Sequence, residues 1–198
     1  IRDCRAEYEE GIDKNALSLG DRLELFLKLC DAMHYAHLKK VIHRDLKPDN
    51  IMIGAFGEAV VMDWGIARII GAARDETIDG NPDEEVELVG NAQTTQDGSV
   101  VGSVGYMSPE QARGDVEELD GRSDQYSLGL ILFELVTLTR GISDGRLMDM
   151  LRRARRGQVN PVVHFSAKET IREELVAIIL KATANNPKSR YENVDALG

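Results

Sequence analysis

Hydrophobic side chains recur every three or four positions between Asp21 and Lys39, and this spacing predicts a helix over that stretch. A second helix is predicted from about residue 122 to residue 138. Its middle, residues 128–133, is apolar on every side, which is typical of a helix buried all round. The sequence therefore predicts one amphipathic helix and one helix enclosed by the rest of the domain.

Short β segments separate these two helices. Residues 41–42 are predicted to be extended, and two strands are expected at residues 51–53 and 59–62, joined by the Gly-containing turn 54–58. Residues 69–103 are expected to form a long loop, because they are rich in Gly, Asp and Thr and show no periodicity. Further helices are expected near residues 146–156 and 168–184, with a last one beginning near Glu192.

The composition indicates a soluble globular domain, since 42% of the 198 residues are hydrophobic and 29% are charged. No apolar run reaches the roughly 18 residues that a membrane span requires, and the nearest, residues 128–136, is interrupted by Glu134. Cys4 and Cys30 are far apart and do not form a metal-binding motif. Cys30 lies on the apolar face of the first helix and is interpreted as a small buried hydrophobe.

The net charge of −10 is concentrated in one stretch of the chain. Eight acidic residues and no Lys or Arg lie between Asp75 and Asp97, so this stretch carries −8 and the rest of the chain only −2. We interpret the stretch as a solvated, disordered loop. Nucleic-acid binding is not expected, because the remaining charge is near neutral and no basic face is evident.

Residues 43–50 read HRDLKPDN, residues 63–68 read DWGIAR and residues 105–111 read GYMSPEQ. In this order and spacing, the segments resemble the catalytic loop, the metal-binding motif and the end of the activation segment of eukaryotic-type protein kinases. Trp64 and the small residue before Pro109 are similar to the bacterial Ser/Thr kinases. The resemblance covers nearly the whole chain and implies an α+β, mostly α fold: the large C-terminal lobe, with a small β-hairpin at the active site.

Phosphoryl transfer requires positioning and charge neutralisation more than covalent chemistry. The resemblance implies that Asp45 orients the substrate hydroxyl as the base, and that Lys47 binds where charge develops on the transferring phosphoryl group. Asn50 and Asp63 are expected to hold Mg²⁺, which prefers oxygen ligands, because the hairpin between them brings its two ends to one edge. Met52 is expected to form the apolar floor under the adenine of ATP.

Five further residues have structural roles implied by the resemblance. His43 and Trp64 are expected in the packed stack that links the two lobes. Asp124 is expected to brace the backbone of the catalytic loop, and a buried carboxylate there is tolerable only if backbone N–H groups satisfy it. Glu110 and Arg190 are expected to form an ion pair that fastens the end of the activation segment to the lobe.

The resemblance also implies a regulatory arrangement. Arg44 and Arg68 are similar to a basic pocket that receives a phosphate on the activation loop, and Thr94, Thr95 and Ser99 are candidate phosphorylation sites. Ser103 is expected to contact the catalytic loop through its hydroxyl group. The loop between Asp63 and Glu110, with its acidic stretch, is about twice as long as in compact relatives.

Several parts of a kinase are not found in this sequence. No G-x-G-x-x-G, no strand lysine paired with a helix glutamate and no adenine hinge can be identified. We therefore expect residues 1–198 to be the C-terminal lobe alone, with the N-terminal lobe either upstream or lost by truncation. His43 and Trp64 would then be exposed, and the isolated chain would be inactive.

The leading hypothesis is a cytoplasmic Ser/Thr protein kinase that transfers the γ-phosphate of ATP to protein hydroxyl groups, with ATP and Mg²⁺ as cofactors. A non-catalytic kinase-like binding module and a small-molecule phosphotransferase are the alternatives. The intact catalytic residues argue against the first, and the Ser108–Glu110 segment with Arg190 favours a protein substrate. Glu134 either recognises a basic side chain of the substrate or is an acid that lines a cleft. Whether a membrane anchor lies outside this segment stays an open question.

Overall fold

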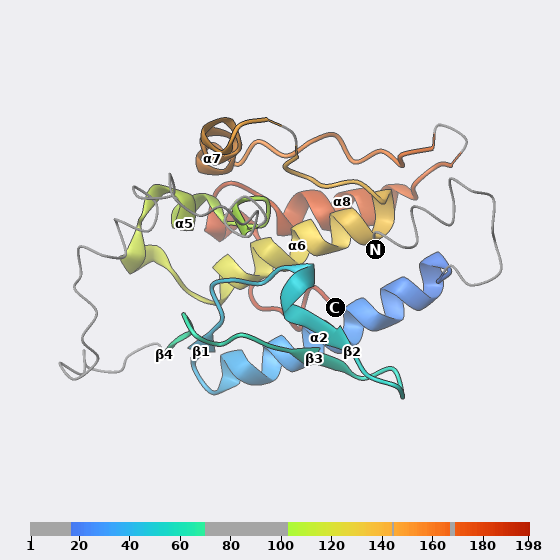
Figure 1. The fold of residues 1–198 in the computed structure, drawn as a ribbon, viewed down its shortest axis with the longest axis horizontal. Coiled ribbons are helices and arrows are strands. Elements are labelled where there is room, and N and C mark those ends of the chain that lie inside the picture. Colours follow the sequence, from blue (N-terminus) through green and yellow to red (C-terminus); the bar gives the residue numbers. More distant parts are fainter. Residues whose placement is uncertain (1–16, 70–102, 144, 167–168) are drawn as a thin grey trace.

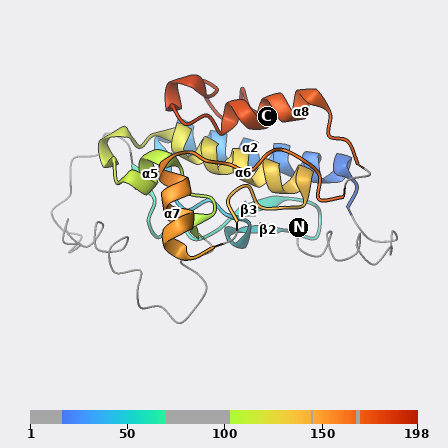
Figure 2. The ribbon, with the colours of Figure 1, turned by 90° about the horizontal axis from the view of Figure 1, so that it is seen from above.

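The computed structural model describes residues 17–69, 103–143, 145–166 and 169–198. Helix α6 (Gly121–Thr137) lies at the centre, between α2 (Leu19–Leu38) and α8 (Glu173–Ala182) (Figure 1). A view turned by 90° shows α8 along one side of the α2–α6 pair (Figure 2). Most side chains of α6 are buried, so the predicted enclosed helix is confirmed.

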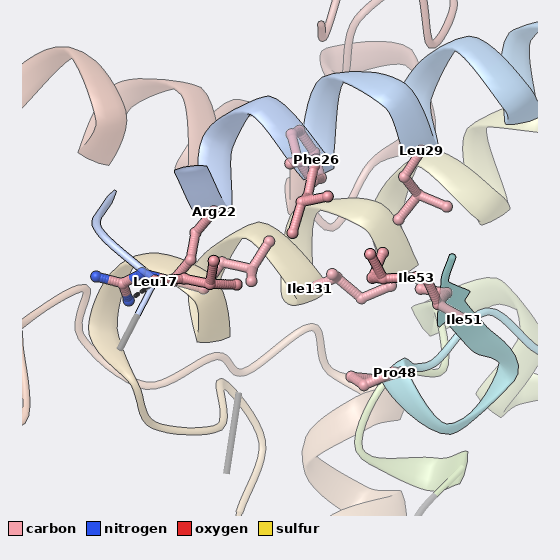
Figure 3. A pocket seen from close by; sticks show the side chains of 10 residues that line it. Leu17, Arg22, Phe26, Leu29, Pro48, Ile51, Ile53 and Ile131 are labelled. Atoms are coloured by element: carbon pink, nitrogen blue, oxygen red, sulfur yellow. Dashed lines mark hydrogen bonds between the residues drawn. The ribbon is translucent and has the colours of Figure 1, made fainter. Parts of the chain in front are cut away.

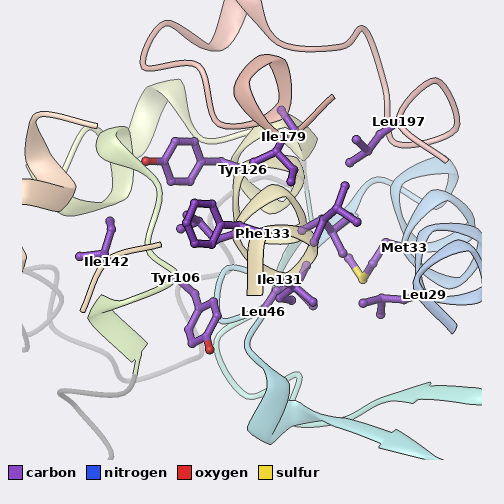
Figure 4. Packing of buried hydrophobic residues seen from close by; sticks show 14 of the residues in the cluster. Leu29, Met33, Leu46, Tyr106, Tyr126, Ile131, Phe133, Ile142, Ile179 and Leu197 are labelled. Carbon is purple, nitrogen blue, oxygen red and sulfur yellow. The ribbon is translucent and has the colours of Figure 1, made fainter. Parts of the chain in front are cut away.

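The core is built around α6. Tyr126 and Phe133 are fully buried and pack among side chains from α2, α8 and the loops (Figure 4). Gly129 permits the close approach of α6 to α8, because a Cβ atom there would lie 2.8 Å from the Cβ of Ala182 and 2.9 Å from the Cγ2 of Thr183. The buried apolar face of α6 therefore fixes the positions of both neighbouring helices.

Helix α2 begins two residues earlier than its hydrophobic pattern predicts. Ser18 accepts a hydrogen bond from the Asp21 N–H group, and the Asp21 carboxylate accepts one from the Ser18 N–H group at 3.0 Å. This reciprocal capping box satisfies the first N–H groups of the helix, so the helix starts at Leu19.

Two small antiparallel sheets lie beside α2. The predicted hairpin is formed by β2 (Ile51–Ile53) and β3 (Ala59–Val61), with Met52 paired to Val60. The two residues predicted to be extended form strand β1 (Val41–Ile42). This strand is hydrogen-bonded to the antiparallel strand β4 (Arg68–Ile69). The partner strand β4 was not predicted, because its two residues lie at the edge of the long loop and carry no alternating pattern of their own.

The remaining elements are two short helices and three 3₁₀ turns. Short helix α5 (Pro109–Arg113) packs against α7 (Leu147–Arg155), and three 3₁₀ turns complete the described elements. These turns are η1 (Pro48–Asn50), η2 (Val116–Glu118) and η3 (Pro187–Ser189).

The end of the chain differs from its prediction. Helix α8 begins at Glu173, five residues later than expected, and the predicted helix from Glu192 is wrong. Asn193 caps a single turn by accepting the Ala196 N–H group, and the Gly198 N–H group donates to the Val194 carbonyl oxygen. One such hydrogen bond makes a turn rather than a helix. Among the described residues, no helix has both the length and the hydropathy to cross a membrane.

Candidate active site

Residues 43–50, which we call the catalytic loop, follow β1 with an unusual backbone. Arg44 has φ +72°, a left-handed conformation that is costly for a residue with a Cβ atom. Asp124 of α6, only 1% exposed, accepts the His43 and Arg44 N–H groups at 2.8 and 2.9 Å. His37 Nε2 lies 2.8 Å from the same carboxylate. Three partners thus compensate the burial of Asp124, and they hold the loop in its strained form.

His43 fixes the next part of the loop. Its Nδ1 accepts the Asp45 N–H group at 3.2 Å, so the proton lies on Nε2, which donates to the Met62 carbonyl oxygen at 2.9 Å. Its ring contacts the Trp64 ring at 4.6 Å between centroids. The expectation that His43 is exposed is wrong, because these contacts and α6 enclose it completely, whereas Trp64 is 39% exposed.

Asp45, Lys47, Asn50 and Ser103 form one hydrogen-bonded group. Lys47 Nζ lies 2.7 Å from Asp45 Oδ2 and 2.7 Å from Ser103 Oγ, and it connects the catalytic loop to Ser103. Asn50 Nδ2 donates to the Asp45 carbonyl oxygen at 2.8 Å and to Asp45 Oδ2 at 3.1 Å. Both donors therefore hold Oδ2, which leaves Oδ1 as the carboxylate oxygen available to an incoming hydroxyl group.

Asn50 and Asp63 lie at the same end of the hairpin. The Met62 N–H group donates to the Asn50 carbonyl oxygen at 2.8 Å. This hydrogen bond lies at the open end of the hairpin, opposite the turn, and Asp63 is the next residue. Asp63 has φ +59° and is exposed. Because Asn50 uses its amide nitrogen for Asp45, its side-chain oxygen is the atom left for a cation.

This donor set fits Mg²⁺, which combines one or two protein oxygen ligands with water and phosphate oxygens. Asn50 would contribute its amide oxygen and Asp63 its carboxylate. Within the described residues, no group of three or more His, Cys, Asp and Glu side chains forms a complete metal site. A Mg²⁺ ion here would accordingly need phosphate and water oxygens to complete its shell.

Glu110 and Arg190 form a fully buried, bidentate ion pair. Arg190 donates to the two carboxylate oxygens at 2.7 and 2.9 Å, and Ser123 Oγ donates to Oε1 at 2.8 Å. Arg190 also lies over the Tyr126 ring at 4.8 Å. Burial alone would raise the pKa of Glu110, but the hydrogen bonds and charge of Arg190 hold that pKa below its ordinary value.

Two residues that support the catalytic loop, Gln111 directly and His37 through Asp124, were not singled out from the sequence. Gln111 Nε2 donates to the Arg44 carbonyl oxygen at 2.6 Å, and His37 contacts Asp124. A local signal for Gln111 exists, because Ser108 and Gln111 form the S-x-x-Q capping box that starts α5. His37 gives no such signal, since its spacing matches the apolar face of α2.

The other expected site residues are only partly placed. Met52 is 51% exposed on β2, and Arg44 NH1 donates to the Ile66 carbonyl oxygen at 3.4 Å. The backbone of Arg68 pairs with Ile42 in the small sheet. Thr94, Thr95 and Ser99 lie outside the described residues, so the phosphate pocket stays a prediction.

A separate apolar cavity of about 180 Å³ lies between the start of α2, the hairpin and α6 (Figure 3). Phe26 and Leu29 line one side and Ile51 and Ile53 the other. Its walls include none of Asp45, Asn50 and Asp63. This cavity is therefore distinct from the group of residues that carries the candidate chemistry.

Comparison with known proteins agrees with this geometry. Residues 5–197 match the family model described as protein kinase domain. The chain is 34% identical to serine/threonine-protein kinase PknD of Protochlamydia amoebophila, over 100% of the chain and 20% of that protein. It is 38% identical to serine/threonine-protein kinase PknB of Mycobacterium leprae, over 86% of the chain and 24% of that protein.

A third relative is serine/threonine-protein kinase PknD of Chlamydia trachomatis, which is 35% identical over 88% of the chain and 18% of that protein. The chain thus spans between 18% and 24% of the length of these curated relatives. The family match nevertheless covers almost every residue, including the catalytic loop, the hairpin and the central helix. The chain belongs to the protein kinase domain family.

Proposed function

We propose that this chain is part of a serine/threonine protein kinase that transfers the γ-phosphate of ATP to hydroxyl groups of protein substrates. The observation that carries the proposal is the hydrogen-bonded group of Asp45, Lys47 and Asn50, with Asp63 at the adjoining hairpin end. Kinship with relatives named serine/threonine-protein kinases supports the same activity.

Each residue of the group has a definite task in this proposal. Asp45 Oδ1 accepts a hydrogen bond from the substrate hydroxyl and directs its oxygen toward the phosphate. Lys47, already placed by Asp45 and Ser103, supplies positive charge beside the transferring group. Mg²⁺ held by Asn50 and Asp63 would neutralise phosphate charge. Because Asp124 and His43 fix the loop backbone, these groups are positioned before substrate arrives.

We also propose that residues 1–198 supply the large lobe of the kinase, and that another lobe supplies the glycine loop and the adenine hinge. Four large apolar side chains near the hairpin, Met52, Met62, Trp64 and Ile66, are exposed. An apolar surface of this kind is typical of a face that another domain covers. The sequence contains no G-x-G-x-x-G that could cover the ATP phosphates.

The test compares variants in the complete protein with radiolabelled ATP and a protein substrate. Asp45→Asn should lower turnover about 10²–10⁴-fold and leave Mg-ATP affinity nearly unchanged, because Asp45 acts on the hydroxyl group rather than on the nucleotide. Asp149→Asn on the exposed side of α7 is the control and should retain wild-type turnover. Near wild-type turnover of Asp45→Asn would contradict the proposal, and unimpaired nucleotide binding without any transfer in the wild type would favour a non-catalytic binding module.

A further inference from the structure

Glu134 of α6 is an almost buried carboxylate that the proposed chemistry does not use. It is 6% exposed and accepts a hydrogen bond from the Tyr106 hydroxyl group. Arg140 approaches it from the loop after α6, with Nε 4.0 Å from Glu134 Oε1 and with its guanidinium carbon 5.9 Å from the centre of the Tyr106 ring. A buried acid is thus shared between a phenol and a guanidinium group.

This acidic position adjoins the catalytic loop. Tyr106 closes a turn on Ser103, whose hydroxyl group binds Lys47. Burial and the adjacent negative charge of Glu134 raise the pKa of the Tyr106 hydroxyl group. Glu134 is therefore linked, through Tyr106 and Ser103, to the residues assigned to the substrate hydroxyl group.

Arg140 is anchored by its backbone rather than by its side chain. Asn160 Nδ2 donates to the Arg140 carbonyl oxygen at 3.0 Å, and the Asn160 N–H group donates to the Gly141 carbonyl oxygen at 2.8 Å. Arg153 in turn donates to Asn160 Oδ1 at 2.7 Å. The guanidinium group itself is one-third exposed and meets Glu134 by a single long contact, unlike the bidentate pair of Arg190.

We propose that Arg140 is a specificity-determining residue that occupies the position beside the Glu134 carboxylate and so excludes a cationic side chain of the substrate. An arginine of an incoming protein would meet a like charge there and would have to displace Arg140 before it could reach the Glu134 carboxylate. The chain would consequently act on segments that are uncharged or acidic at this position. This inference rests on the proposed kinase function.

The experiment uses the complete protein and serine-containing peptides in which one arginine is moved through the positions flanking the serine, each with a glutamine counterpart. In the wild type, the arginine peptide should not surpass its glutamine counterpart at the position that reaches Glu134. In Arg140→Gln, the ratio of kcat/KM for the arginine peptide over its counterpart should rise about tenfold at one position, through KM rather than kcat. Fluorescence anisotropy of labelled peptides should show the same shift in affinity without turnover.

Two further variants give the matched controls. Adding Glu134→Gln to Arg140→Gln should abolish the gain, because it removes the acid that the peptide arginine would bind. Arg156→Gln, an exposed arginine beyond α7, should leave every ratio unchanged.

Equal affinities of arginine and glutamine peptides for Arg140→Gln would overturn the inference, whether or not phosphate is transferred. A strong preference of the wild type for arginine at that position would overturn it too. Absence of transfer to any substrate would instead contradict the proposed function, while the affinity ratios would still decide the role of Arg140.

Discussion

At the scale of single residues, Asp124 determines the backbone conformation of the catalytic loop through its hydrogen bonds. One carboxylate satisfies two adjacent backbone N–H groups of the catalytic loop, and one of these belongs to Arg44 at φ +72°. Strain of this kind persists only where surrounding contacts hold it. The side chain of one buried helix residue thus sets the backbone that presents Asp45.

Asp124→Asn should therefore destabilise the fold and lower turnover. An amide has only one acceptor oxygen, so one buried N–H group would lose its partner, at a cost of about 1–3 kcal/mol. Denaturant unfolding and phosphate transfer would be measured together. Asp120→Asn is the control: Asp120 caps the same helix, and Asn caps a helix as well as Asp does, so its stability should hardly change. Equal effects of the two substitutions would contradict this account.

The Glu110–Arg190 pair predicts a dependence of stability on pH. The pKa of Glu110 lies below its ordinary value of 4.5 in the folded state, so its contribution is fully present above pH 4.5. That contribution should be lost as the pH falls below 4.5 and through the folded-state pKa. Glu110→Gln should flatten this part of the profile of unfolding free energy against pH.

Removing only one member of this pair should cost about 3–5 kcal/mol, because the other charge stays buried, and a double apolar replacement should recover part of the loss. The exposed pair of Arg113 and Asp115 provides the comparison, and Asp115→Asn should cost less than about 1 kcal/mol. Strictly additive losses in a double-mutant cycle of Glu110 and Arg190 would show that the buried pair does not contribute as a unit.

Sequence patterns find some of these residues and miss others for a physical reason. Asp45, Asn50 and Asp63 stand in short motifs, so their spacing alone suggests a shared site. His37 and Gln111 act on partners 87 and 67 positions away, and only the packed helices bring them there. In the local sequence, His37 looks like part of the apolar face of a helix and Gln111 looks like part of a helix cap, so neither pattern reveals the distant partner.

At the scale of elements, periodicity predicts the helices, whereas caps and pairings decide where elements end. Helices α2 and α6 follow from their apolar spacing, but the Ser18 capping box moves the start of α2. Strand β4 forms because β1 lies beside it and supplies its hydrogen-bond partners. The two residues of β4 carry no sequence pattern that would predict this pairing. The predicted helix after Glu192 fails because its residues complete only one turn.

The close contact of α6 with α8 gives a prediction at this scale. Gly129→Ala should destabilise the fold by about 1–3 kcal/mol in denaturant unfolding, because the added methyl group overpacks the contact with Ala182 and Thr183. Gly20→Ala in α2 is the matched control, since its Cβ atom would meet only Ser18 Oγ at 3.5 Å. That change should stabilise the fold by up to about 1 kcal/mol, because alanine favours the helix. Stabilisation by Gly129→Ala would disprove the tight contact.

At the scale of the whole molecule, the proposed large lobe would supply the base and the metal ligands, and the proposed second lobe would supply the glycine loop and the adenine hinge. Kinases reach about 1–100 s⁻¹ mainly by positioning and charge stabilisation between two lobes. On the exposed hairpin face, water would screen the charges that act on the phosphate. The apolar side chains there, including Met52 and Trp64, also favour association with another surface.

Purified residues 1–198 alone should therefore transfer phosphate to a generic protein substrate far more slowly than a two-lobed relative. Radiolabelled transfer measures this directly, with Asp45→Asn in the same chain as the background. Turnover within about tenfold of the relative would overturn the assignment of this chain as a lobe that needs a partner lobe.

The three partners of Asp124 also have a consequence for the order in which the chain folds. They lie 80 to 87 residues before it, at the end of α2 and in the catalytic loop. Contacts over such separations form only after a long loop has closed, and synthesis proceeds from the N-terminus. During synthesis on the ribosome, the strained backbone of the catalytic loop therefore cannot be stabilised by Asp124 until α6 has emerged. We expect this site to be assembled late, so a nascent chain that ends before α6 contains every side chain that we propose to be catalytic but does not hold them in place.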